Sequence, residues 1–239
     1  EPFILAPVGN DFGPYKTFLQ KHKISTHYIV EHSDVSTSAY FVMTDREDNQ
    51  IGSFFLGATK YAKKLKTADC KKKPNFIVLA PTEPTAMKQY VKECRAAKLP
   101  YLYDPAFQIG TFTPVELREG ITGAQILIGN DYEIALIEQK LEISHEELIV
   151  MVPILVTTLG SRGSIVETRK EAIHVKPAKP TDTSDPTGAG DAYRAGFVAG
   201  YLKHYDLAVC GQMGSTAAVY TVEKYGTQTH KFTKKEFIR

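Results

Sequence analysis

Short, continuous apolar runs alternate with longer mixed stretches through most of the chain after residue 74. The runs predict buried strands, and the stretches that follow them predict helices. The predicted strands are 76–80, 100–103, 126–129 and 154–158, and the predicted helices are 84–97, 191–203, 207–225 and two that begin near 131 and 144. This alternation favours an α/β fold, with a mostly parallel sheet covered by helices on both faces. Such sheets bind ligands beyond the carboxyl ends of their strands.

The pattern differs near the amino end. A strand at 3–8 and a helix ending near residue 22 are followed by a region, 27–56, that is rich in Tyr, Val, Ile, Phe and Thr and contains no helical pattern. Strands are predicted at 27–30, 37–44 and 51–56, the last two forming a hairpin around the polar residues 45–50. A β-only segment inside a strand–helix chain suggests a lid. We therefore expect an α/β domain made of 1–26 and 58–239, and a β lid made of 27–57.

Composition excludes several classes of protein. The chain has 239 residues, 43% of them hydrophobic, which suffices for one sizeable core. The net charge of +2 and the absence of a long basic run argue against nucleic acid as a partner. No run of about 18 apolar residues predicts a membrane span. Three widely spaced cysteines form no disulfide framework, which fits a reducing cytoplasm.

The most informative stretch runs from Asp182 to Gly196. Pro186 keeps Asp185 out of the helical region, and the glycines after it allow a tight turn before a helix. The first backbone N–H groups of that helix, at 188–191, would attract a phosphate. A carboxylate at such a place, Asp191, could accept a proton from a hydroxyl that attacks the phosphate. The alternative is an ordinary Asp-Pro turn followed by an ordinary helix cap.

Two further polar clusters follow predicted strands. Asn130 and Glu133 are spaced as a helix capping box, and the alternative is that Glu133 holds Mg²⁺, through water, with Asn130 near the phosphates. In the 157–163 segment, Thr158, Gly160 and Gly163 could hold a nucleotide, and the alternative is a hairpin turn between two strands. A predicted hairpin at 164–168 and 173–175 follows directly.

The order of these motifs carries a resemblance to a known family. The chain lacks the G-x-x-x-x-G-K-[ST] sequence of P-loop enzymes. Instead, Asn130-Asp131-Tyr132-Glu133, Thr158-Leu159-Gly160 and Asp185-Pro186-Thr187-Gly188-Ala189-Gly190-Asp191 occur in that order. This resembles the ribokinase-like (PfkB) kinases of sugars and nucleosides over nearly the whole chain, and is most similar to the bacterial adenosine kinases. The resemblance implies a three-layer α/β/α fold with a small β-sheet lid.

The resemblance also implies an activity and a set of roles. The activity is ATP-dependent phosphorylation of the 5′-hydroxyl of adenosine or a related nucleoside, as in purine salvage, with Asp191 as the base. Gly188, Ala189 and Gly190 would form the anion hole, and Glu133 would serve Mg²⁺. Asp185 and Thr187 would help hold a monovalent cation such as K⁺. The nucleotide contacts implied are Asn130, Thr158, Gly160, Gly163, Thr187 and, where many sugar kinases carry Asn against the adenine, Ser215.

Aromatic residues of the lid favour a nucleoside over a bare sugar. Tyr40 and Phe54 lie on predicted strands and could stack on a base. The alternatives are that they fill the small core of the lid itself or form a homodimer contact. A lid would also exclude water, which matters because hydrolysis of ATP competes with transfer.

The beginning of the chain departs from the family pattern. The family starts with a strand whose acid contacts the acceptor, followed by a glycine-rich segment, and neither precedes Glu1. We expect at least roughly 30 residues, the size of a βαβ unit, to be missing, and little activity from the sequence as it stands. Two other functions therefore stay open: a PfkB-type sugar kinase and a non-catalytic nucleotide-binding module.

Overall fold

The computed structural model describes residues 2–44 and 50–237, and the chain divides into two compact units, 1–101 and 102–239. The first unit opens with the parallel pair β1 (Ala6–Val8) and β2 (Ile29–Glu31), joined by α1 (Gly13–Lys21). Val8, Phe12 and Leu19 form a small hydrophobic cluster there. The predicted strand at 3–8 is shorter than expected, because Phe3 makes only an isolated bridge to Ser25.

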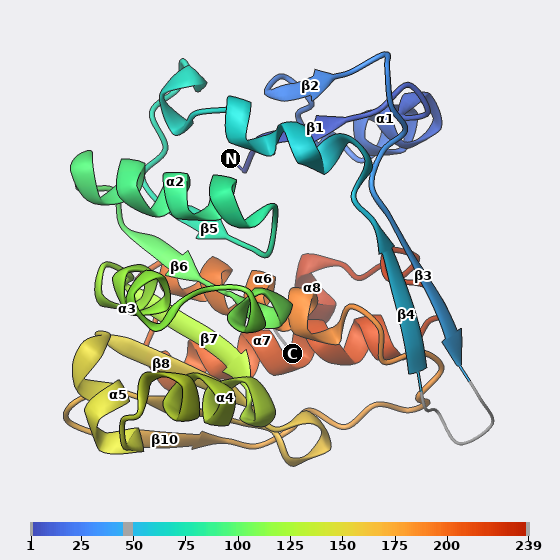
Figure 1. The fold of residues 1–239 in the computed structure, drawn as a ribbon. Coiled ribbons are helices and arrows are strands. Elements are labelled where there is room, and N and C mark those ends of the chain that lie inside the picture. Colours follow the sequence, from blue (N-terminus) through green and yellow to red (C-terminus); the bar gives the residue numbers. More distant parts are fainter. Residues whose placement is uncertain (1, 45–49, 238–239) are drawn as a thin grey trace. The chain divides into compact units, whose positions relative to one another are not determined.

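The predicted hairpin is present. β3 (Ala39–Thr44) and β4 (Gln50–Phe55) pair antiparallel (Figure 1). In their register, Tyr40 lies opposite Phe54. Of the predicted turn at 45–50, residues 45–49 lie outside the described residues, and Gln50 is the first residue of β4. No third strand joins these two among the described residues, since β2 pairs with β1 instead. The exposed side chains of the ribbon are largely apolar: Tyr40, Phe41, Val42, Met43, Ile51, Phe54 and Phe55.

The rest of the first unit agrees with the predicted alternation. A 3₁₀ segment, Gly57–Lys64, leads to β5 (Ile77–Leu79) and α2 (Pro84–Ala96). Glu83 caps α2 by accepting a hydrogen bond from the Ala86 N–H at 2.8 Å, and proline occupies the first helical position. The buried face of α2 carries Met87, Tyr90, Val91 and Cys94.

The second unit contains the main sheet. Its strand order is β10-β9-β8-β7-β6, in which β6 (Tyr101–Tyr103), β7 (Ile126–Asn130) and β8 (Ile154–Thr158) are parallel. The predicted hairpin follows, with β9 (Ser164–Glu167) antiparallel to both β8 and β10 (Ala172–Val175). β7 and β8 are in register, so that Asn130 lies opposite Thr158 at their carboxyl ends. The sheet is therefore mostly parallel, as predicted, with an antiparallel edge.

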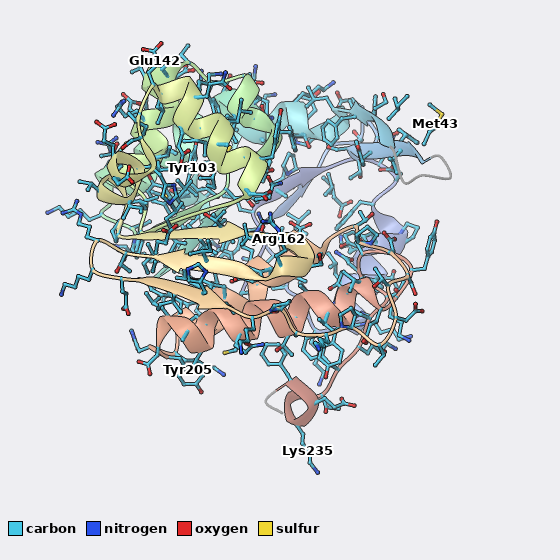
Figure 2. The ribbon with its side chains drawn as sticks, turned by 90° about the horizontal axis from the view of Figure 1, so that it is seen from below. Met43, Tyr103, Glu142, Arg162, Tyr205 and Lys235 are labelled. Atoms are coloured by element: carbon cyan, nitrogen blue, oxygen red, sulfur yellow. The ribbon has the colours of Figure 1, made fainter. Side chains whose placement is uncertain are left out.

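Helices cover both faces of this sheet. α3 (Pro114–Thr122), α4 (Asp131–Leu141) and α5 (His145–Met151) lie on one face, and α6 (Ala189–Tyr201) and α7 (Leu207–Val222) lie on the other (Figure 2). This is the expected α/β/α arrangement. The sequence analysis missed α3, although Thr113 and Glu116 cap it reciprocally. It also missed the short α8 (Lys234–Phe237).

Close packing fixes α6 against α7. A Cβ atom added to Gly196 would lie 2.4 Å from the carbonyl oxygen of Met213, so only glycine allows this approach. The buried hydroxyl of Tyr193 makes a 2.6 Å hydrogen bond with Ser164 of β9, which ties α6 to the sheet. Burial raises the pKa of Tyr193 to about 12. The helix that begins at the glycine-rich motif is thus held on two sides.

Two expectations from composition can be compared with the structure. Within the described residues, no helix combines the length and the apolar character needed to cross a membrane. Cys70, Cys94 and Cys210 are buried free thiols, in agreement with the absence of a disulfide framework.

A histidine side chain links three elements of the second unit, α4, α5 and β9. His145, at the start of α5, contacts Glu138 of α4 through Nδ1 at 2.6 Å and Glu167 of β9 through Nε2 at 3.0 Å. Burial alone would lower the pKa of His145, but hydrogen bonds to the two carboxylates outweigh that effect and raise it above the ordinary value. Only the doubly protonated ring can donate both hydrogen bonds.

We predict that His145→Gln lowers the free energy of unfolding by roughly 1 kcal/mol at pH 6 and by less at pH 9. The raised pKa means that the charged ring stabilises the fold fully below about pH 6.5, and that this contribution disappears as the pH rises through the folded-state pKa. Urea unfolding at both pH values measures the difference. His174→Gln, on the exposed face of β10, is the matched control. An equal loss at both pH values would contradict the assignment of charge to His145.

Candidate functional site

The glycine-rich motif forms the beginning of α6, as predicted, but the helix starts two residues earlier, at Ala189. Gly188 precedes it with φ +85°, a left-handed conformation that favours glycine, and an added Cβ would lie 3.2 Å from Thr227. The Ala189 N–H donates to the Pro186 carbonyl at 3.2 Å, while those of Gly190 and Asp191 have no acceptor within the described residues. The predicted row of four free donors is thus reduced to a smaller anion cradle. An added Cβ on Gly190 would meet nothing within 4 Å, so the space beside it is open.

Asp185 holds the motif in place. Its Oδ1 accepts a hydrogen bond from the Thr187 N–H at 2.9 Å, and its Oδ2 accepts one from the Gly226 N–H at 3.0 Å. Hydrogen bonding by the Thr187 side chain, and then by both backbone groups, keeps the pKa of Asp185 below its ordinary value. The backbone N–H groups of Ser184 and Asp185 also donate to the carbonyl of Val222. The motif is therefore anchored to the end of α7.

Asp191 is the carboxylate of the cradle. Its side chain is 74% exposed, and its Oδ1 accepts a hydrogen bond from Arg194, one turn further along α6. Desolvation by the surrounding protein raises the pKa of Asp191 above its ordinary value. A neighbouring positive charge, such as the Arg194 guanidinium, favours the ionised carboxylate. An open carboxylate beside free N–H groups is the arrangement that the sequence analysis predicted for a base.

The sequence analysis missed Arg194 and Asp104 as site residues. Asp104 directly follows β6 and binds the other nitrogen of the Arg194 guanidinium. The Arg194 and Asp104 side chains are only 12% and 14% exposed. Its position in the sequence could have identified Asp104, because it directly follows a predicted strand, just as Asn130 and Thr158 lie at the ends of theirs.

Asn130 and Glu133 form the predicted capping box at the start of α4. The Asn130 Oδ1 accepts from the Glu133 N–H at 2.8 Å, and the Glu133 Oε2 accepts from the Asn130 N–H at 2.8 Å. The cap is confirmed, and it occupies one oxygen of each side chain. No partner of the Asn130 amide nitrogen or of the other Glu133 oxygen is seen among residues 2–44 and 50–237, so both are available for a ligand.

The 158–163 loop connects β8 to β9 as a hairpin turn, which was one of its two interpretations. The Leu159 N–H donates to the Gly163 carbonyl at 2.8 Å, and Gly160 and Gly163 have φ values of +58° and +94°. Arg162 of this loop forms a 2.6 Å ion pair with Asp131 at the start of α4. The loop therefore lies beside the Asn130 cap. The two segments predicted to contact the nucleotide, at Asn130 and at 158–163, are thus neighbours.

Ser215 is placed differently from the other candidates. It is 7% exposed, and its Oγ accepts a hydrogen bond from the Ala178 N–H at 2.7 Å. Its hydroxyl thus supports the 176–187 segment from α7, and a direct contact with adenine stays a prediction that this geometry does not favour.

The lid aromatics lie in the first unit, on β3 and β4. Tyr40 and Phe54 are 58% and 50% exposed, which argues against the interpretation that they fill a core of the lid. The Tyr40 ring lies across Gly52, where an added Cβ would be 2.0 Å from the hydroxyl oxygen. Tyr40 therefore lies flat on the ribbon and leaves an aromatic face open.

A family model described as pfkB family carbohydrate kinase matches residues 1–234. A nucleoside kinase of Methanothermobacter thermautotrophicus is 35% identical over 231 residues, which are 95% of this chain and 74% of that protein. A nucleoside kinase of Methanocaldococcus jannaschii is 31% identical over 95% of this chain and 75% of that protein.

The fold is also similar to solved structures. The nucleoside kinase of Burkholderia thailandensis in complex with inosine has a TM-score of 0.94 and 27% identity, over 98% of this chain and 77% of that one. The same enzyme has been solved in complex with ADP-inosine, with a TM-score of 0.93.

Proposed function

This chain belongs to the pfkB family of carbohydrate kinases and is a phosphotransferase with a hydroxyl acceptor, and we propose that it phosphorylates the 5′-hydroxyl of adenosine or a related nucleoside with ATP. The observation that carries the proposal is the open Asp191 carboxylate beside the free N–H groups of Gly190 and Asp191 at the start of α6. The archaeal relatives and the inosine complex support a nucleoside rather than a sugar as the acceptor.

Asp191 is the proposed base. Its exposed carboxylate can accept the proton of the attacking hydroxyl, and its raised pKa favours that transfer. The free N–H groups of the first turn of α6, with the helix dipole, would stabilise the negative charge on the transferred phosphoryl group. We assign this anion hole to Gly188, Ala189 and Gly190. Of these, Gly190 has open space beside it and an N–H group without an acceptor among the described residues.

The nucleotide is proposed to lie along the carboxyl ends of β7 and β8. Asn130 and Thr158 lie opposite each other there, and Gly160 and Gly163 shape the adjoining loop. The Asn130 amide nitrogen would donate to phosphate oxygens. Ser215 would act indirectly, by holding the 176–187 segment that leads into the motif.

Oxygen ligands suit both proposed cations. The Glu133 oxygen that the capping box leaves available would serve Mg²⁺ through water, and Mg²⁺ would neutralise charge on the phosphates. Asp185 and Thr187 would help hold K⁺ near the motif, although both Asp185 oxygens already accept backbone hydrogen bonds. Equal activity in KCl and NaCl at one ionic strength would remove the K⁺ proposal.

The lid is proposed to contribute to the acceptor site and to a homodimer. Tyr40 offers an open aromatic face for a base, and Phe54 lies opposite it. The apolar ribbon extends further, to Met43 and Ile51, which are each 72% exposed. A second copy of the ribbon could cover these side chains. Sedimentation equilibrium of the wild type and of Met43→Lys tests this, since a monomeric wild type would remove the dimer.

We predict that nucleosides, and not free sugars, are the productive acceptors. A panel of adenosine, inosine, cytidine, ribose and fructose, assayed for ADP release with ATP, should give turnover with at least one nucleoside, adenosine foremost. Turnover with the sugars alone would favour the sugar-kinase alternative. Binding of ATP without turnover of any acceptor would favour the non-catalytic module.

Asp191→Asn should lower kcat by about 10³-fold or more, because general base and charge contributions are lost together. ATP binding, measured by calorimetry, should change little, since the backbone N–H groups are retained. Asp182→Asn, in the same polar segment, is the control and should keep its turnover. Near-normal kcat in Asp191→Asn would remove the base assignment.

Glu133→Gln separates the cap from the proposed metal role. Glutamine can still accept the Asn130 N–H, so the melting temperature should stay within a few degrees of the wild type. The Mg²⁺ concentration for half-maximal activity should rise severalfold, because a charged oxygen ligand is lost. Unchanged Mg²⁺ dependence would leave Glu133 as a cap alone.

A further inference from the structure

The buried ion pair between Asp104 and Arg194 reaches from the end of β6 to the Asp191 carboxylate. We propose that Arg194, anchored by Asp104, is a positioning residue that orients the Asp191 carboxylate for the transfer reaction. The inference rests on the proposed function, in which Asp191 is the base.

The geometry of the guanidinium supports this role. One terminal nitrogen of Arg194, Nη1, donates to the Asp104 Oδ2, and the other, Nη2, donates to the Asp191 Oδ1. Both donors belong to one rigid plane, so the contact with Asp104 also fixes the direction from which Asp191 is held. The Oδ2 of Asp191 has no partner within the described residues and is available to the acceptor hydroxyl.

The three charges are unequally exposed. Arg194 and Asp104 are 12% and 14% exposed, whereas Asp191 is 74% exposed. A buried guanidinium without a counter-charge would be unfavourable, and Asp104 supplies that charge. The net negative charge of the trio then resides on the exposed carboxylate. Asp191 gains an oriented hydrogen bond, while Asp104 offsets much of the positive field that would otherwise weaken it as a base.

The surroundings of α6 make the arrangement rigid. Tyr193 is bound to Ser164 of β9, and Gly196 packs on the backbone of α7 at Met213. Within the described part of the chain, the carboxylates that pair with Arg194 are Asp104, which follows β6, and Asp191 of α6 itself. On α7, the titratable thiol of Cys210 packs against Gly200 of α6, which is nine residues beyond Asp191.

A purely structural link between α6 and the sheet is the competing explanation. It predicts a loss of stability from either partner but no directed change in the chemistry. Positioning predicts opposite shifts in the acid limb of the pH dependence of kcat/KM. Without the Arg194 charge, no positive charge opposes the effect of desolvation on Asp191, so its pKa should rise and the limb should move to higher pH. Without the Asp104 charge, Arg194 acts fully on Asp191, so the limb should move to lower pH.

The experiment uses Arg194→Met, Arg194→Lys and Asp104→Asn in the full chain, with the nucleoside acceptor found active. We expect Arg194→Met to lower kcat about 10- to 100-fold with the KM for ATP within about twofold. Arg194→Lys should recover part of the lost kcat. Added guanidinium ion should restore activity to Arg194→Met but not to Arg194→Lys. Arg118→Met is the control, because Arg118 binds the Leu141 carbonyl and the Met151 sulfur away from the motif.

The outcomes separate the inference from the proposed function. Activity retained in Asp191→Asn would contradict the assignment of Asp191 as the base and, with it, the positioning role of Arg194. An inactive Asp191→Asn together with a wild-type kcat and pH profile in both Arg194 variants would overturn the inference alone. If Arg194→Met fails to fold, Asp104→Asn decides through the direction of its pH shift, since Arg194→Lys keeps the positive charge, and an unshifted limb in Asp104→Asn would overturn the inference.

Discussion

The parallel pairing of β6, β7 and β8 is the constraint on which the site depends. Parallel strands end at one edge of a sheet, so the residues that end or follow them, Asp104, Asn130 and Thr158, share that edge. The strand interiors are almost fully buried, including Leu102, Leu127 and Leu155,. Burial therefore fixes the register, and the register places the polar edge residues without any contribution of their own to the core.

The beginning of α6 leaves backbone N–H groups without an acceptor beside this edge, within the described residues. It combines free N–H groups with a charged side chain buried behind them, and both are unfavourable for folding alone. The remainder of the helix offsets this through its contact with α7 and the Tyr193 hydrogen bond to Ser164. A rigid helix body thus supports an exposed, reactive end, as a ligand-binding helix terminus requires.

Several motif residues have a structural role as well as a proposed chemical one. Asn130 and Glu133 cap α4, Asp185 ties the motif to Gly226, and Gly163 closes the turn before β9. The structural explanation was thus correct for the Asn130 cap and the hairpin turn at Gly163, whereas the Asp or Thr cap expected before α6 is absent, because Gly188 precedes the helix without a side-chain cap. A structural role does not compete with ligand binding. A carboxylate that accepts one hydrogen bond from the backbone still has an oxygen or a lone pair for another partner. Local order in these loops can therefore precede the binding of any nucleotide.

Local patterns in the sequence were sufficient for the strand–helix alternation, the hairpin of the lid, the capping boxes and the family. These features depend on residues close together in the chain, such as Asn130 with Glu133, so their physical cause is visible in a short window. The sequence also placed Asp191 at a helix start. It did not indicate that Arg194 would join Asp191 to Asp104, which is ninety residues away from Arg194. That contact exists only because the sheet and the packing of α6 on α7 bring two distant segments together. Only the tertiary structure could pair these buried charges, because a guanidinium pairs with a carboxylate that is close in space, whatever their spacing along the chain.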